Sequence, residues 1–313
     1  MLDADYLNVL LFYSFSFGCF PFIALFLFIL INKSTSSMRM YRNTLLNMIV
    51  WYSFAVFTFG VLLQPVYADL DAKNCAKLYG LGTMLFGAFG GYGVCYASAI
   101  TILNTGTAIV LCFFYRYTAL EWPHLSIHTN SLYAFLLGLT THTVSTVIAI
   151  IISFPLISVA QITRDNQVYF LCIEQPDQHS FMLLATALIA YMVTHCIVGL
   201  TFIYLSIRIL LKRRSQMSER TYRLQRLMTL SLIILAVLPI FMDVVPITIS
   251  AVVLLLQTDC IYVVFSAAAH VPFFEVALVC LVTIGFVTPY RRTLFAMLNA
   301  KKLSLLKMRP FFT

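Results

Sequence analysis

Residues 103–117 read LNTGTAIVLCFFYRY, an apolar stretch that ends in one charge between two tyrosines. Arg116 is the only basic residue between Lys77 and Arg164. An arginine at such a place can lie at the inner edge of a membrane, with its stem along the helix and its guanidinium among lipid phosphates. The pattern predicts a membrane-spanning helix that ends near Arg116, and the depth of other residues can be counted from that position.

The composition excludes an ordinary soluble domain. The 313 residues are 61% hydrophobic and 10% charged, and the mean hydropathy is +0.92. Soluble domains are about a quarter charged, so a chain this apolar needs lipid as the solvent for most of its side chains. The formal net charge is +8. No basic run alternates with aromatic residues in the manner of a nucleic-acid surface, so no nucleic-acid partner is expected.

Seven apolar segments are long enough to cross a lipid bilayer. Each is expected to be a helix, because lipid offers the backbone no other hydrogen-bond partner. The predicted fold class is therefore an all-α membrane protein, a seven-transmembrane helix bundle that forms one domain over residues 1–313. Loops join the spans, and a short amphipathic tail helix lies on the membrane surface. The expected spans are 7–31, 45–66, 83–117, 131–158, 181–211, 227–256 and 261–288, and the tail helix is expected over 289–300.

The basic residues predict the orientation of the bundle. If the amino terminus lies outside, the inner loops and the tail contain 17 of the 20 Lys and Arg residues, and only Lys73, Lys77 and Arg164 lie outside. Cytoplasmic loops of membrane proteins carry an excess of these residues. We therefore expect the amino terminus outside and the carboxyl terminus in the cytoplasm.

The cysteines agree with this orientation. Cys75, Cys172 and Cys260 fall in expected outer loops, on the oxidising side of the membrane. Counting back from Arg116 at about 1.5 Å per residue puts Cys95 roughly 31 Å higher, at the outer boundary. Cys172 can therefore pair with Cys75 or with Cys95, and the sequence does not choose between them. The alternative is that these thiols are free and buried.

Charged residues inside membrane spans are expensive and mark candidate sites. Asp243 lies between Pro239 and Pro246, two prolines that are expected to bend the sixth span into a hinge. Glu275 falls in the outer part of the seventh span. Two interpretations stay open for each acid: polar contact with a ligand in an outward-facing cavity, or a structural latch between helices.

Two histidines are further ligand candidates. His195 and His270 lie in the outer halves of their spans, although a lone histidine is more often a satisfied interior residue. The sequence has no nucleophile elbow, zinc-protease motif, phosphate loop or dinucleotide fingerprint. An enzyme is therefore not expected, and neither is a cofactor or a metal.

The turn after the fifth span is strongly basic and includes Arg213 and Arg214. One interpretation is that these charges only set the orientation and attract anionic lipid. The other is that they help to bind a cytoplasmic partner, because a bent sixth helix beside this turn can swing and open a groove.

Several short motifs resemble one known family. They are SMRMYRNTLLN at 37–47, CAKLYG at 75–80, VCY at 94–96, FFYRYTAL at 113–120 and GFVTPYRR at 285–292. The chain resembles the nematode serpentine chemoreceptors of the Str superfamily. It is most similar to class D (Srd), with class H or Str proper as near alternatives. The resemblance extends over residues 37–295.

The resemblance implies a chemosensory receptor in the plasma membrane of a sensory neuron, at its cilium. Such a receptor binds a small-molecule odorant, apolar or weakly polar, that enters the bundle from outside, and it couples to a heterotrimeric G protein. By similarity, Arg116 takes the place of the arginine in the rhodopsin-like D/E-R-Y motif. Tyr115 replaces the acid, so the usual neighbouring ionic lock is absent. The implied coupling residues are Tyr115, Arg116, Tyr117, Arg213, Arg214, Pro289, Tyr290 and Arg291.

A membrane transporter or a ligand-gated channel is the alternative function, because seven spans and two intramembrane acids can also carry a solute. The sequence shows no inverted repeat and no paired broken helices, which many transporters have. The oligomeric state is left open.

Overall fold

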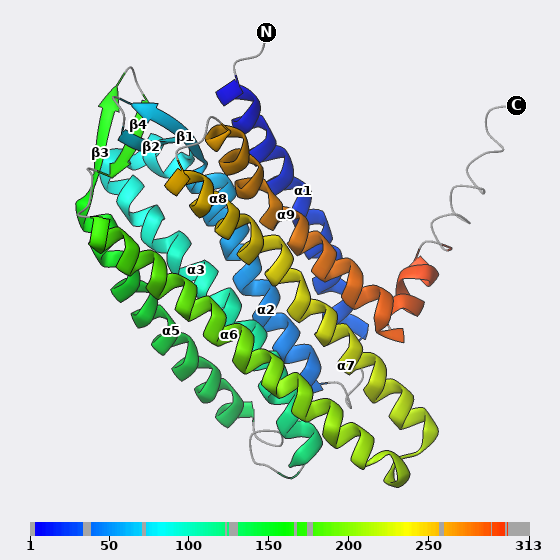
Figure 1. The fold of residues 1–313 in the computed structure, drawn as a ribbon. Helices are drawn as coiled ribbons and strands as arrows, with labels where there is room; N and C mark the ends of the chain where they lie inside the picture. The colour runs from blue at the N-terminus through cyan, green and yellow to red at the C-terminus, as the bar shows by residue number, and fades with distance from the viewer. Residues whose placement is uncertain are drawn as a thin grey trace, which may run out of the picture.

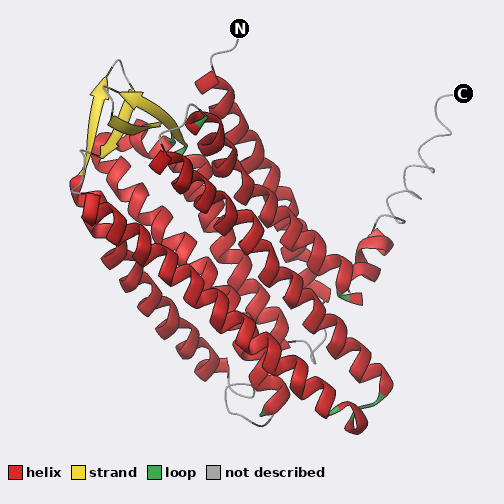
Figure 2. Ribbon diagram, in the orientation of Figure 1, coloured by secondary structure: helices red, strands yellow, loops and turns green. Residues whose placement is uncertain are grey.

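The computed structural model describes residues 4–33, 39–70, 73–122, 124, 131–165, 168–173, 178–256, 260–288, 290–297 and 299. Seven long helical spans run side by side as a bundle, with a small sheet at one end (Figure 1). The predicted helical fold class with seven membrane spans is confirmed. Strands occur only at that one end within the described part of the chain (Figure 2).

The spans are built from ten described helices, eight α-helices and two π-helices. They are α1 (Ala4–Lys33), α2 (Arg39–Phe57) with its π-helical continuation η2 (Thr58–Leu63), α3 (Leu81–Glu121), α5 (Ser131–Val159), α6 (Gln178–Lys212), α7 (Glu219–Pro239) with η4 (Ile240–Val244) and α8 (Val245–Leu256), and α9 (Ile261–Phe286). A short 3-10 turn, η3 (Arg214–Gln216), joins α6 to α7, and residues 290–297 are helical.

The sixth span, α7–η4–α8, is called helix six below. It begins with Ser218, whose hydroxyl accepts a hydrogen bond from the Thr221 backbone N–H and so caps the helix. Pro239 ends α7, and the widened π turn of η4 follows before Pro246 enters the first turn of α8. The two prolines therefore bracket an irregular turn, and that turn sets the direction in which Asp243 points.

Helix α3 has 41 residues and would be about 60 Å long if straight, twice the thickness of a hydrocarbon core. It is broken at Gly87, where φ is +61°, a conformation that glycine adopts without strain. The short helical segment before the break exposes Met84, Leu85 and Phe86. The glycines of this region were not recognised as a helix break from the sequence.

Two connections expected to be loops form a four-stranded sheet instead. The strands are β1 (Pro65–Leu70), β2 (Lys73–Leu78), β3 (Ala160–Asp165) and β4 (Val168–Ile173), in the order β1-β2-β4-β3, and all neighbours are antiparallel. Each connection is a hairpin, and β2 pairs with β4 to join the two. Strand β4 reads VYFLCI, and such β-branched and aromatic residues favour a strand. The span expected over 45–66 ends at Leu63 because Pro65 already belongs to β1.

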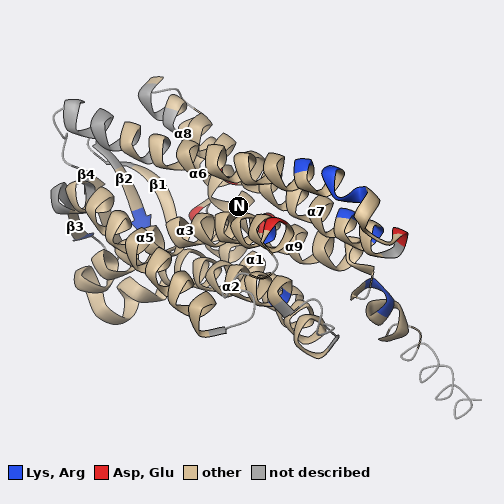
Figure 3. Cartoon of the chain, turned by 90° about the horizontal axis from the view of Figure 1, so that it is seen from below, with Lys and Arg blue, Asp and Glu red and all other residues tan. Residues whose placement is uncertain are grey.

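Cys75 and Cys172 are paired in the sheet register and form a disulfide, one of the two pairings that the sequence left open. Cys95 is a free thiol. The end of the bundle that carries the sheet is called the sheet end below. The opposite end, where α6 ends and α7 begins, is called the basic end, because Lys and Arg gather there (Figure 3).

Replacing Cys172 with serine is expected to lower the free energy of unfolding by about 2–5 kcal/mol, because the disulfide closes a loop with a sequence separation of 97 residues. The measurement is the melting temperature of the purified protein in detergent. Cys260→Ser is the matched control, since Cys260 is an exposed cysteine outside the disulfide. An equal loss in both variants, or no loss in either, would contradict this prediction.

Candidate functional site

A cavity of about 1640 Å³ opens at the basic end of the bundle. Its walls come from α2, α3, α7 and α9 and from the residues that follow α9. The cavity is strongly positive, because its charged lining residues are four arginines and one glutamate: Arg116, Arg223, Arg291, Arg292 and Glu219. A cavity of this size and charge can hold part of a negatively charged protein segment.

Arg116 ties α3 to helix six inside this cavity. Its side chain is only 8% exposed. Its Nη2 donates to the backbone carbonyl of Gln225 over 2.8 Å and to Thr229 Oγ1 over 3.1 Å, and its Nε lies 3.4 Å from the same hydroxyl. The guanidinium therefore points to helix six and not to lipid phosphates, which corrects the position expected from the sequence. The physical reason is that α7 offers buried acceptors within reach.

The tyrosines beside Arg116 reach two other helices. Tyr115 Oη donates to the Ala134 carbonyl of α5 over 2.8 Å. The Tyr117 ring packs 5.7 Å from the Phe202 ring of α6 and edge-on to Trp122. The Tyr-Arg-Tyr motif thus contacts α5, α6 and α7 from one turn of α3.

The other predicted coupling residues divide into groups. Arg213 Nη2 donates to the Glu121 carbonyl over 3.1 Å and lies 3.9 Å from its carboxylate, so it ties the ends of α6 and α3. Arg214 lies over the Tyr222 ring. Arg291 lines the cavity, whereas Tyr290 is fully buried in the apolar core. Pro289 lies outside the described residues.

Three spans meet at a buried pair of acids. Glu275 of α9 is 1% exposed and accepts a hydrogen bond from Tyr52 Oη of α2. The Asp243 carboxyl, carried by η4, is hydrogen-bonded to the Glu275 carboxyl. A hydrogen bond between two carboxyl groups needs a proton on one of them, so the pair holds a proton between them. These contacts join α2, helix six and α9, and they fit the interpretation of a polar latch between helices.

The two acids differ in accessibility. Glu275 is enclosed, but Asp243 keeps some accessible surface. Asp243 is therefore the more accessible member of the pair. The structure brings these two predicted ligand residues together and leaves the two histidines elsewhere.

His195 belongs to a network between α3, α5 and α6. Its Nδ1 donates to the Tyr191 carbonyl over 3.0 Å, and its Nε2 lies 3.4 Å from Thr107 Oγ1. Tyr191 Oη lies 3.1 Å from Ser145 Oγ. His270 lies on the other side of the bundle, where its ring packs 4.3 Å from the Phe12 ring and its Nδ1 donates to the Ser266 carbonyl.

A second polar network, centred on His142, was not predicted from the sequence. His142 Nδ1 donates to Asn104 Oδ1 over 2.8 Å, which leaves Nε2 to accept from Trp51 Nε1 at 3.2 Å and Asn47 Nδ2 at 3.0 Å. The His142 network therefore joins α2, α3 and α5. The signal that marks it is the polar run Thr140–Thr143 within an otherwise apolar span.

Comparison with known proteins identifies a family. The model of the family described as "Serpentine type 7TM GPCR chemoreceptor Srd" matches residues 8–296, which is nearly the whole chain. No curated protein matches the sequence. Groups of three or more potential metal ligands are absent from the described residues.

Proposed function

Because the chain belongs to the Srd family of serpentine type 7TM GPCR chemoreceptors, we propose that it binds a small-molecule odorant and signals to a heterotrimeric G protein. The family is one of receptors, not enzymes, and its members are integral membrane proteins with seven spans. The observation that carries the proposal is the positive cavity at the basic end, with Arg116 at its wall.

The proposed orientation places the sheet end outside the cell and the basic end in the cytoplasm. The excess of Lys and Arg at the basic end supports this, since cytoplasmic loops of membrane proteins are basic. The Cys75–Cys172 disulfide supports it too, since disulfides persist on the oxidising side of a membrane. The plasma membrane of a sensory neuron, at its cilium, is the proposed location.

The proposed docking site for the G protein is the cavity at the basic end. Arg223, Arg291 and Arg292 surround it and favour a segment with negative charge or a free carboxylate. Arg116 is bonded to α7 across the cavity. For the cavity to widen, helix six has to move outward and these bonds have to break.

The proposed coupling between ligand and cavity runs along helix six. Asp243 lies at the π turn of η4, between the two prolines, and is bonded to Glu275. A ligand that competes for Asp243 weakens the latch and changes the direction of α8 relative to α7. It activates the receptor only if it binds the open state more tightly than the closed one.

The test is a panel of volatile and weakly polar compounds applied to cells that express the receptor with a G protein, read by calcium or cyclic nucleotide. A response that needs both the receptor and the G protein supports the proposal. An amino-terminal epitope is expected to be accessible on intact cells, and a carboxyl-terminal one is not. Ligand-evoked ion flux in liposomes without any G protein would instead favour the channel or transporter.

A further inference from the structure

The first helical segment of α3, residues 81–86, folds back along the helix that follows it. The chain turns at Gly87, where φ is +61°. Beyond the turn, a Cβ on Gly90 would lie 2.1 Å from the backbone oxygen of Gly82, and a Cβ on Gly82 would lie 2.4 Å from the Val94 side chain. On one straight helix, residues eight and twelve positions apart are separated by about 12 and 18 Å along the axis. The two legs therefore form a helical hairpin, and glycine allows them to touch.

Four large apolar side chains project from this helical hairpin and are called the apolar patch below. Their exposed fractions, 69% for three of them and 85% for the fourth, are the highest among the described large apolar residues: Met84, Leu85, Phe86 and Phe89. Ile151, within the α5 span, is 64% exposed. Another side of the hairpin is covered by the sheet, since a Cβ on Gly91 would contact Ile162 of β3 and Leu78 of β2. The apolar patch therefore needs a partner outside the described chain.

The length of α3 places the apolar patch at the height of lipid headgroups. Counting from Arg116 at about 1.5 Å per residue puts Phe89 roughly 40 Å along the helix. The hydrocarbon core of a bilayer is about 30 Å thick, and the bilayer with both headgroup layers is about 40–45 Å thick. Since Arg116 lies at the basic end, the apolar patch lies just beyond the hydrocarbon core at the sheet end.

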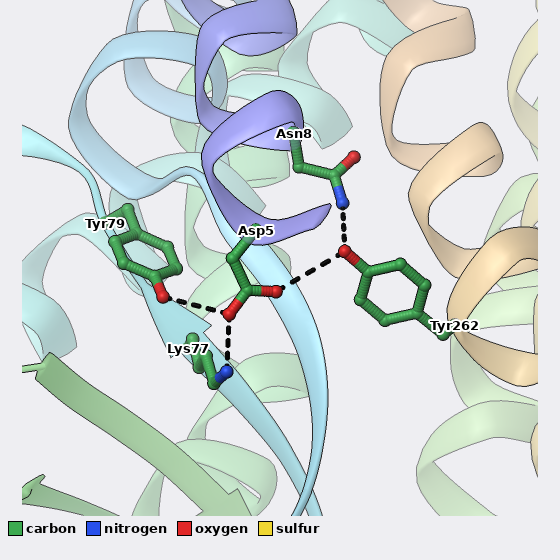
Figure 4. Close-up of polar contacts among 5 residues, drawn as sticks. All are labelled: Asp5, Asn8, Lys77, Tyr79 and Tyr262. Carbon is green, nitrogen blue, oxygen red and sulfur yellow. Dashed lines mark hydrogen bonds and ion pairs between the residues drawn. The ribbon is translucent and has the colours of Figure 1, made fainter. Parts of the chain in front are cut away.

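A polar cluster beside the hairpin marks the water boundary at a similar height (Figure 4). Lys77 of β2 forms an ion pair with Asp5 of α1, which also accepts a hydrogen bond from Tyr79 Oη over 3.1 Å. Tyr262 Oη of α9 donates to the other Asp5 oxygen over 3.4 Å and accepts from Asn8 over 2.7 Å. Charges are expensive in hydrocarbon, so this cluster lies outside it. Helix α3 begins four residues after Lys77, so the hairpin starts close to the boundary.

The sequence of the hairpin favours lipid over a second protein as the partner of the apolar patch. Residues 78–115 contain no Asp, Glu, Lys or Arg. The hairpin itself therefore offers no charged rim, whereas interfaces between proteins usually surround an apolar centre with a polar rim. An apolar helix face at the membrane surface needs no such rim, because it is buried about 5–10 Å into the boundary between headgroups and acyl chains.

We propose that residues 81–89 form a membrane anchor, with the apolar patch inserted at the boundary of headgroups and acyl chains in the leaflet at the sheet end. In the proposed orientation this is the outer leaflet. Tyr169 of β4 rests on the turn of the hairpin, since a Cβ on Gly87 would lie 3.3 Å from its hydroxyl. The anchor therefore also sets the height of the sheet on one side, and the Asp5 cluster fixes it to α1 and α9. The partner is the lipid surface, and the anchor acts without an odorant or a G protein.

The test introduces the photoreactive amino acid p-benzoylphenylalanine at Phe86, and in a second variant at Phe89. Both side chains are exposed, so the probe replaces no packed residue. Each purified receptor is placed in nanodiscs of a single phospholipid, one receptor per disc, and irradiated. The excited probe bonds to a C–H group that it touches, so peptide mass spectrometry identifies a lipid adduct by its added mass. Ile151 is the control position in the bilayer, and Gln216, exposed in η3, is the control position in water.

Lipid adducts at Phe86 and Phe89 are expected to be about as abundant as at Ile151. They are expected to exceed those at Gln216 by about tenfold or more, because transfer of a phenyl side chain from water to an apolar environment is favourable by at least that factor. Adducts at both positions no higher than at Gln216 would show that the apolar patch faces water, which overturns the proposal. A cross-link between two receptors in cells, with no lipid adduct in the discs, would overturn it too, because a second copy would then cover the patch. The discs contain no odorant and no G protein, so the result is independent of signalling.

Discussion

Replacing Arg116 with alanine is expected to abolish ligand-evoked G-protein signalling while the receptor still reaches the cell surface. The guanidinium is the buried charge at the wall of the basic-end cavity, and it is bonded to Gln225 and Thr229 in the described conformation. In the proposed mechanism helix six moves outward, and the same group then meets the G protein. Alanine removes both roles. The measurement is the calcium or cyclic-nucleotide response, normalised to surface epitope.

Arg208→Ala is the matched control for Arg116→Ala. Arg208 carries the same charge near the same end of the bundle, but it is exposed on α6 and does not line the cavity. Its removal is expected to leave the response unchanged. Normal signalling from surface-expressed Arg116→Ala would remove Arg116 from the mechanism.

Thr229→Val separates the two roles of Arg116. Valine keeps the shape of the side chain but removes the hydroxyl that accepts from the guanidinium. Hydrogen bonds to a charged group contribute about 1.5–3 kcal/mol, so the closed state should lose about ten- to a hundredfold in population relative to the open one. Signalling without ligand is therefore expected to rise in Thr229→Val. A basal signal equal to that of the unchanged receptor would show that these bonds do not hold helix six.

The sequence predicts the seven spans well because each is set by local composition. Charges are rare inside them, so Arg116, Asp243 and Glu275 were visible as unusual residues without any structure. Contact across the bundle was not visible in the same way. Glu275 meets Tyr52 and Asp243 from two other spans, and no spacing along one helix encodes which faces turn toward each other.

The partners of Arg116 show a similar limit. The sequence showed that an acid is missing beside it, but Gln225 contributes a backbone carbonyl, which any residue has. Thr229 is one of many threonines, and threonine in a span commonly bonds to its own helix, as Thr229 also does. The sheet was missed for another reason: the short strands were interpreted as loops between spans, although VYFLCI in β4 has strong strand propensity.

The second large effect is expected at the buried acid pair. Glu275→Ala should lower the free energy of unfolding by about 3–5 kcal/mol, the usual result of removing one partner from a buried charged or proton-sharing pair. The Tyr52 hydroxyl then has no acceptor at this position, and the Asp243 carboxyl loses the group with which it shares a proton. The measurement is the melting temperature of the purified receptor in detergent. It is obtained from the fraction of the protein that stays monodisperse as the temperature rises.

Glu275→Gln is the decisive comparison, because glutamine has almost the same shape. Its amide oxygen can accept from Tyr52 Oη and its amide N–H can donate to the Asp243 carboxylate, so both bonds of the latch persist without a shared proton. The loss is expected to be below about 1 kcal/mol, smaller than the loss in Tyr52→Phe, which removes one hydrogen bond worth about 1 kcal/mol or more. The expected order of melting temperatures is Glu275→Gln, then Tyr52→Phe, then Glu275→Ala as the lowest. Equal destabilisation by glutamine and alanine would contradict this prediction. It would mean that the bonds to Tyr52 and Asp243 do not hold the three spans together at this point. The direction of helix six would then be set by its prolines alone.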